Sequence, residues 1–225
     1  KKTISEVGND NILHAQDQTW LWNHSGVWEI CSDRTIKQIA QSVIDSEDID
    51  VSSGLVNGVS DVLKSEINSA DHLFNLGNPE TVNCLNGQLE LEDGIFQLRP
   101  HKREEYRTTQ IPIVFDSNAA AEGFKKFLAE IFETDQDAHE KIECLLQMIG
   151  YTLMSHSRHE KFIMLIGNGA NGKSVLLAII EALCGSSNVA GVQPSKFESS
   201  FQRAHLHNKL ANIVTELSEG EKLAD

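Results

Sequence analysis

The sequence is short of positive charge, of cysteine pairs and of long apolar runs, and each shortage excludes a class of protein. Its 225 residues include 19 Lys and Arg against 33 Asp and Glu, a net charge of −14, so bulk positive charge cannot support nucleic-acid binding. The four cysteines form no CxxC pair, which argues against a zinc ribbon or a CxxC redox motif. No apolar run approaches the roughly 18 residues of a membrane helix, and the Lys1-Lys2 start leads into a polar segment. We therefore expect a reduced, cytoplasmic protein without a membrane segment.

The acidic residues are unevenly distributed along the chain. The sequence has 13 basic and 27 acidic residues up to position 160, and 6 of each after it. The apolar pattern changes near the same position, although no Pro-rich linker marks it. We therefore expect two domains, residues 1–157 and residues 158–225. The acidic surface of the first is either an ordinary solvated helical surface or a docking face for a partner protein.

The first domain is expected to be helical with a small β unit. Residues 18–28 alternate large apolar residues around a polar turn, which predicts a hairpin whose three tryptophans form its core. Asn86-Gly87 and Asp93-Gly94 predict two further hairpin turns. Apolar spacing predicts helices over about 35–44, 53–66, 119–133 and 136–154. Ser32 or Asp33 is expected to cap the first of these helices, Asp116 or Ser117 the third, and Leu146 is expected on the inner face of the last.

A glycine-rich loop follows a continuous apolar run. Residues 162–166, FIMLI, predict a strand that is buried on both faces of a parallel sheet. The next eight residues read GNGANGKS, which satisfies the phosphate-loop pattern GxxxxGK[ST], and helical apolar spacing follows them. Such a loop points backbone N–H groups at phosphate oxygens, and the following helix adds its partial positive charge. The expected nucleotide-binding residues are Gly167, Asn168, Gly169, Ala170, Asn171, Gly172, Lys173 and Ser174.

The loop and a second apolar segment together predict a hydrolytic site. Lys173 is expected to reach the β- and γ-phosphates, and the Ser174 hydroxyl to bind Mg²⁺. Residues 210–216, LANIVTE, are expected to form a strand that ends in Glu216, which would hold Mg²⁺ and orient the attacking water. Glu219 and Glu221 lie close enough in sequence to take that role instead. The expected cofactors are therefore ATP and Mg²⁺.

Three segments upstream of the loop accompany it in a fixed order. They are NCLNGQLEL at residues 83–91, YRTTQIPIVFD at residues 106–116, and the pair Gly150-Tyr151. Together with GNGANGKS they resemble the phage and plasmid primase-helicases, a family related to the poxvirus primase-helicase and driven by a superfamily 3 helicase motor. The resemblance covers nearly the whole chain. It implies an α/β protein: an α-rich N-terminal domain with a small β unit, followed by the first half of an AAA+-like P-loop motor with a parallel sheet.

The resemblance also implies a function. Such motors hydrolyse ATP, assemble as rings that are usually hexamers, and move along single-stranded DNA, here at a phage or plasmid origin in the cytoplasm of a bacterial host. The family's glutamate after the second strand corresponds to Glu216. The family's DNA-contacting hairpin, polar sensor and arginine finger would lie beyond Asp225, so the resemblance implies a fragment with weak or no turnover of its own. The alternative is a docking or oligomerisation module whose truncated ATPase is inert.

Other features have more ordinary interpretations. A small-molecule P-loop kinase is disfavoured because only Arg203 follows the loop among the arginines. The pairs His156/His159 and His205/His207 have spacings seen in metal sites but no third patterned ligand, so no further metal site is predicted. The one dense basic stretch either contacts a DNA backbone or forms a solvated loop that Glu104 and Glu105 balance. That stretch contains Arg99, His101, Lys102, Arg103 and Arg107.

Overall fold

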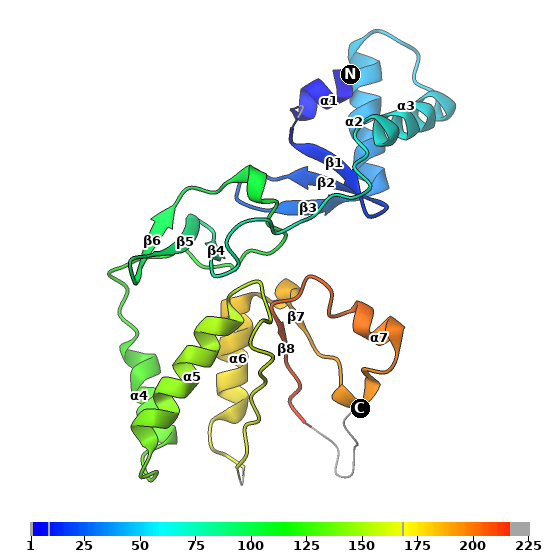
Figure 1. The fold of residues 1–225 in the computed structure, drawn as a ribbon. Helices are drawn as coiled ribbons and strands as arrows, with labels where there is room; N and C mark the ends of the chain where they lie inside the picture. The colour runs from blue at the N-terminus through cyan, green and yellow to red at the C-terminus, as the bar shows by residue number, and fades with distance from the viewer. Residues whose placement is uncertain (1, 9, 168, 217–225) are drawn as a thin grey trace. The chain divides into compact units, whose positions relative to one another are not determined.

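The computed structural model describes residues 2–8, 10–167 and 169–216, and it has a mixed α/β fold of helices and small antiparallel sheets (Figure 1). The chain divides into two compact units. The first consists of Lys1–Gly77 with Lys102–Thr108, and the second of Asn78–His101 with Thr109–Asp225. This division rests on contacts between residues in space. It does not test the predicted domain boundary at residue 157, which stays a prediction.

The first unit contains a three-stranded antiparallel sheet beside helices. Its elements are α1 (Lys2–Val7), β1 (Ile12–Ala15), β2 (Gln18–Trp22), β3 (Trp28–Cys31), α2 (Asp33–Ser46) and α3 (Ser53–Glu66). Strands β2 and β3 form the predicted hairpin, with Trp22 opposite Trp28. Trp20, Trp22 and Trp28 are all buried and form one cluster with Ala15, against which Phe74 packs. The prediction that the tryptophans form a core is confirmed.

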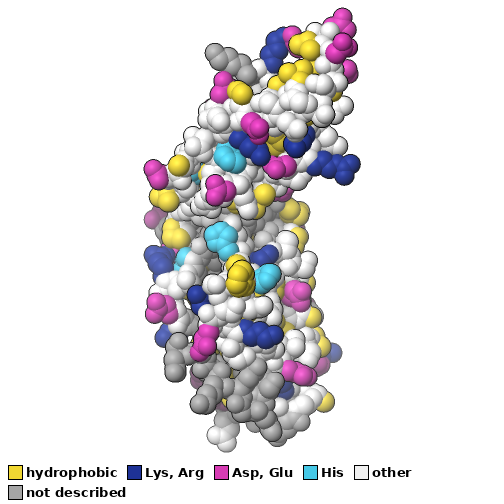
Figure 2. All heavy atoms as spheres, turned by 90° about the vertical axis from the view of Figure 1, so that its right-hand side faces the viewer, with side chains coloured by type: hydrophobic (Ala, Val, Ile, Leu, Met, Phe, Trp, Pro, Cys, Tyr) yellow, Lys and Arg dark blue, Asp and Glu magenta, His cyan; other side chains and the backbone are white. Residues whose placement is uncertain are grey.

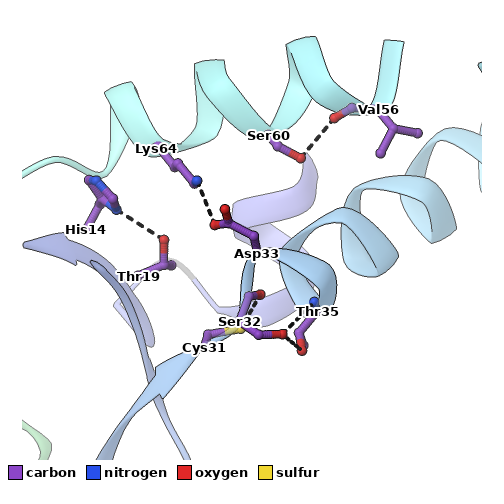
Figure 3. A network of polar contacts seen from close by, with 9 residues as sticks. All are labelled: His14, Thr19, Cys31, Ser32, Asp33, Thr35, Val56, Ser60 and Lys64. Carbon is purple, nitrogen blue, oxygen red and sulfur yellow. Dashed lines mark hydrogen bonds and ion pairs between the residues drawn. The ribbon is translucent and has the colours of Figure 1, made fainter. Parts of the chain in front are cut away.

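Helices α2 and α3 begin where the sequence predicts, because serine side chains cap both. The Ser32 hydroxyl accepts a hydrogen bond from the backbone N–H of Thr35, at 3.1 Å, and Ser52 does the same for Leu55, at 3.2 Å. Lys64 of α3 donates to the Asp33 carboxylate at the start of α2, at 2.8 Å (Figure 3). This ion pair links the two helices on their exposed side, while their apolar faces form the packed interior.

Residues 102–108 return to the first unit and close its aromatic core. A 3₁₀ turn, η1 (Arg103–Glu105), leads into Tyr106, whose ring stacks on Trp28 with ring centroids 5.1 Å apart. The backbone N–H of Trp28 donates to the carbonyl of Arg107, at 2.7 Å, and its indole N–H donates to the carbonyl of Arg103, at 3.0 Å. The dense basic stretch is therefore partly a structural segment and not simply a solvated loop.

The arginines of this stretch are paired with carboxylates. The Arg107 side chain is 1% exposed and lies 2.8 Å from the Glu105 carboxylate. Gly77 leaves room for this pair, because a Cβ there would overlap both charged groups. Arg99 binds Glu92 at 2.9 Å, and Arg103 binds Glu104 at 3.0 Å, both on the surface.

The second unit begins with an antiparallel sheet of β4 (Val82–Cys84), β5 (Gly87–Glu92) and β6 (Ile95–Arg99). The two predicted turns connect its strands. Residues 109–115 run beside β4: the N–H of Leu85 donates to the carbonyl of Ile113, and the N–H of Ile111 donates to the carbonyl of Asn83, both at 2.9 Å. The Asn86 amide also bonds both the N–H and the carbonyl of Phe115, each at 2.9 Å. The segments NCLNG and QIPIVF are therefore neighbours in space.

The helices of the second unit are α4 (Glu122–Ile131), α5 (Ala138–Thr152), α6 (Lys173–Cys184) and the short α7 (Ser200–Ala204). The first three share one core, and its buried residues are Leu128, Leu145, Ile149, Leu176, Ile180 and Cys184. Two details were predicted wrongly: Ala121, without a side-chain bond, precedes α4 in place of Asp116 or Ser117, and Leu146 is 46% exposed. None of the described helices is long and apolar enough to cross a membrane.

The predicted strand at residues 162–166 is wrong for the described structure. These residues form no regular element, and Phe162 and Ile166 are 78% and 85% exposed. Only Leu165 packs against the helical core. A buried strand needs hydrogen-bonded neighbours and cover on both faces. Among the named strands of the described residues, only β7 (Val189–Ala190) and β8 (Ala211–Asn212) pair in parallel, and a single isolated parallel bridge joins His14 and Asn68 in the first unit. The described residues therefore contain no parallel sheet of more than two strands.

We predict that Arg107→Leu lowers the free energy of unfolding of the first unit by about 3–5 kcal/mol, because it leaves the Glu105 carboxylate without its buried partner. All three tryptophans lie in this unit, so urea unfolding followed by tryptophan fluorescence measures it. The matched control is Lys2→Leu in the same unit, whose pair with Glu47 is exposed and should cost no more than about 1 kcal/mol. Equal costs for the two variants would contradict a structural role for the buried pair.

Candidate nucleotide-binding site

The phosphate-loop sequence lies directly before α6, where an anion is favoured. Gly172 precedes the helix with φ +81°, and no side chain caps the helix start. The first turn contains no acidic residue. The first backbone N–H groups of an α-helix have no acceptor within the helix, and the helix dipole makes this end partly positive. The start of α6 can therefore accept phosphate oxygens.

Lys173, the first residue of α6, folds back over the loop. Its ammonium donates hydrogen bonds to the Asn171 side-chain oxygen at 2.6 Å and to the Gly167 carbonyl at 3.1 Å. Gly167 permits this approach, because a Cβ there would overlap the Asn171 amide. Asn168 lies outside the described residues. The loop thus holds the lysine ammonium through two neutral oxygens. A phosphate group is a charged and therefore stronger acceptor, and it can take their place.

Side chains of helix α4 lie against the loop at Gly172. A Cβ on Gly172 would lie 2.8 Å from the Ile131 side chain and 3.1 Å from the Phe127 ring. Gly169 and Ala170 also have positive φ values, +93° and +48°, but nothing lies within 4 Å of a Cβ on Gly169. Close packing against α4 therefore adds a second requirement for glycine at position 172. Sequence reasoning missed this support, since α4 lies some forty residues away along the chain.

The predicted acidic residue, Glu216, follows a strand much shorter than expected. The Asn212 amide bonds the N–H and carbonyl of Val192, at 2.8 and 2.9 Å, and so fixes β8 beside the segment after β7. The Glu216 carbonyl accepts a bond from the Gln193 amide at 3.2 Å, and the Glu216 residue is exposed. Within the described part of the chain, Glu216 forms no hydrogen bond or ion pair with Lys173 or Ser174. Its catalytic role stays a prediction, and Glu219 and Glu221 lie outside the described residues.

Sequence reasoning also missed Asn212. The only sign of it is a polar residue inside the apolar run LANIV, whose pattern predicts a longer strand.

The His156/His159 pair lies against an aromatic ring. His156 and His159 pack around the Tyr151 ring, each with ring centroids 5.2 Å from it. Across the described ranges, no group of three or more His, Cys, Asp or Glu side chains is placed to hold a metal ion.

Comparison with known families assigns the N-terminal part of the chain. Residues 2–133 match the family described as D5 N terminal like, which is the N-terminal domain of phage and plasmid primase-helicase-like proteins. This match spans more than half of the sequence, and the chain belongs to that family. Residues 165–225, which contain the phosphate loop, match a family of unknown function (DUF5906). No curated protein matches the chain. The predicted primase-helicase-type N-terminal domain is confirmed.

We predict that Gly172→Ala destabilises the second unit by more than Gly169→Ala does. Both substitutions force a side chain into a left-handed conformation, which costs about 1–2 kcal/mol, but only that at position 172 also meets Phe127 and Ile131. Urea unfolding followed by helical circular dichroism measures both variants. Equal destabilisation would show that α4 does not constrain the loop.

Proposed function

We propose that this chain is the ATP-binding part of a replication primase-helicase that couples ATP hydrolysis to DNA unwinding at a phage or plasmid origin. One observation carries the proposal: a complete GxxxxGK[ST] loop opens α6 in a chain of the D5 N terminal like family. The loop provides an uncapped helix start and a lysine held by loop oxygens. These are the features that bind nucleotide phosphates in P-loop proteins.

In this proposal each site residue has a distinct role. Lys173 leaves the loop oxygens, binds the β- and γ-phosphates and stabilises the charge that develops on the transferring phosphoryl group. The Ser174 hydroxyl and the Glu216 carboxylate, both on exposed residues, hold Mg²⁺. When bound, the ion neutralises charge on the β- and γ-oxygens. Glu216 also orients a water for in-line attack on the γ-phosphorus, which breaks the bond to the β-phosphate oxygen and yields ADP and phosphate.

The proposed DNA partner is single-stranded and contacts the complete ring, usually a hexamer. The basic stretch around Arg103 is not assigned to DNA, because its arginines are paired with carboxylates. Lys and Arg side chains also lie interleaved with Asp and Glu on the face shown in Figure 2. DNA binding that depends on the assembled ring agrees with the net charge of −14.

A docking module is the second candidate function. Its support is a group of exposed apolar side chains in the acidic first unit: Ile49 is 51% exposed, Val51 41% and Val62 59%. Asp48 and Asp50 flank Ile49 in the connection between α2 and α3. Size-exclusion chromatography with light scattering separates the candidates. A nucleotide-independent complex with a partner protein favours docking, and assembly that requires ATP favours the motor.

We predict that Lys173→Ala weakens binding of a fluorescent ATP analogue with Mg²⁺ at least about tenfold, because the phosphates lose their cation. Fluorescence anisotropy titration measures the affinity. Lys125→Ala is the control, since Lys125 is exposed on α4 and pairs with Glu122. Unchanged affinity in the Lys173 variant would remove the assignment of the site.

We predict that Glu216→Gln preserves nucleotide binding and abolishes hydrolysis, because the amide keeps the shape of the side chain but loses the charge that holds Mg²⁺ and orients water. The measurement is phosphate release by the chain extended through the motor segments that the resemblance implies, with Glu198→Gln as the control. If the Glu216 variant still turns over ATP, the acidic residue lies elsewhere, and Glu219 is the next to test.

A further inference from the structure

Helix α3 has apolar residues on two sides, and only one side is buried. Val56 and Leu63 are buried in the apolar clusters that α3 shares with α2. Leu55 and Val62 are exposed, at 37% and 59%. They lie seven positions apart, which is about two helical turns, so they share a face that we call the outer face of α3. A helix that packs only on its own domain has polar residues at such positions.

Two glycines accompany the exposed apolar residues on the outer face. Gly58 is three positions after Leu55 and four before Val62, and Gly54 is one turn before Gly58. In the described part of the chain nothing lies within 4 Å of a Cβ at either glycine, and neither has a positive φ. Glycine inside a helix is less stabilising than alanine, and it is used where another backbone must approach closely. The fold of the first unit therefore gives no reason for glycine here, whereas contact with a further helix does.

The chain around the outer face is acidic. Residues 38–63 contain five acidic residues and no basic residue. Asp61 lies on α3, and Asp48 and Asp50 lie in the connection that leads into the helix. Among the residues that the structure describes, none of these three carboxylates pairs with a cation. Figure 2 shows hydrophobic and acidic side chains side by side at the top of the view, where α2 and α3 lie.

These charges decide which kind of partner fits the outer face. Unpaired carboxylates beside an apolar stripe favour a partner that supplies Lys or Arg side chains around apolar ones. A second copy of this chain is disfavoured, because a two-fold interface would bring the same carboxylates against one another. Phosphate groups of nucleic acids and of anionic lipids are repelled for the same reason.

We propose that the outer face of α3 binds a basic amphipathic helix of another protein. The apolar stripe of that helix packs on Leu55 and Val62, its backbone approaches at Gly54 and Gly58, and its Lys and Arg side chains pair with the carboxylates named above. This proposal rests on the docking module, the second candidate function, and it names the chemistry of the partner. It does not depend on the proposed ATPase site.

The test uses a fluorescently labelled peptide of Leu and Lys, about 14 residues long, with Leu spaced along one face of roughly four helical turns. Fluorescence anisotropy measures its binding to the whole chain. We expect one-to-one binding, at least about tenfold tighter than that of a scrambled peptide of the same composition or of a Leu and Glu peptide with the same spacing. Absence of binding, or equal affinity for the scrambled peptide, would overturn the proposal. These comparisons use the unaltered protein.

Two variants of α3 locate the bound peptide. Val62→Lys should weaken binding at least about tenfold, because it replaces an apolar contact with a charge that repels the peptide. Asn57→Lys is the matched control: Asn57 is exposed on the same helix and undergoes the same change in charge, but it lies about 140° around the helix from Val62. Equal losses in the two variants, with circular dichroism preserved, would indicate general attraction to an acidic protein and would overturn the site.

A third variant tests the close approach. Gly58→Gln should also weaken peptide binding while leaving the fold intact, because glutamine is a better helix former than glycine and its side chain meets open space. Gly123→Gln on α4 is the control, since Gly123 is also helical with open space around it. Unchanged binding by Gly58→Gln would contradict the role given to the glycines.

Light scattering distinguishes failure of this site from failure of the docking function. A partner complex that survives Val62→Lys would keep the docking function but overturn this face as its location. Absence of any nucleotide-independent complex would remove the docking function, and this proposal with it. A dimer of the unaltered chain that Val62→Lys dissociates would assign the face to a second copy and would likewise overturn the proposal.

Discussion

A buried guanidinium needs a partner, and the pairing of Arg107 with Glu105 organises the first unit. Burial of an unpaired charge costs several kcal/mol, so both side chains must stay in place, and Gly77 must lack a Cβ to leave them room. The pair fixes residues 102–108, whose carbonyls accept bonds from Asn75, Leu76 and Trp28. Tyr106 then stacks on Trp28. A stretch that reads as a basic surface loop is therefore a wall of the aromatic core.

In the second unit, packing between helices positions the phosphate loop. Helices α4, α5 and α6 share one core, and the contact of Gly172 with α4 sets the position where the phosphate loop meets α6. The two ends of α6 differ in chemistry. Its start offers uncapped N–H groups and Lys173, whereas its end contributes Leu183 to an apolar cavity.

The family and the loop support the functional proposal at different levels. Membership of the D5 N terminal like family places the chain among primase-helicase-like proteins. The loop supplies the chemistry, because its glycines and lysine match what phosphate binding requires. The segments NCLNG and QIPIVF, which carried part of the resemblance, bond to one another through Asn83, Leu85 and Asn86. Their joint occurrence in the sequence therefore has a structural reason.

The sequence by itself determined helices α2 to α6, the hairpins β2–β3, β4–β5 and β5–β6, the Ser32 cap and the phosphate-loop motif, because these depend on residues only a few positions apart. The tertiary structure decided which of these patterns are buried. Residues 162–166 read as a buried strand but remain exposed, since burial needs neighbouring strands that the described residues do not supply. Arg107 has the composition of a surface cation but is buried, because Gly77 and Trp28 from distant parts of the chain lie against it, and Glu105, two residues away, pairs with its charge. Local spacing specifies elements, whereas burial and pairing depend on contacts that only the folded chain brings together.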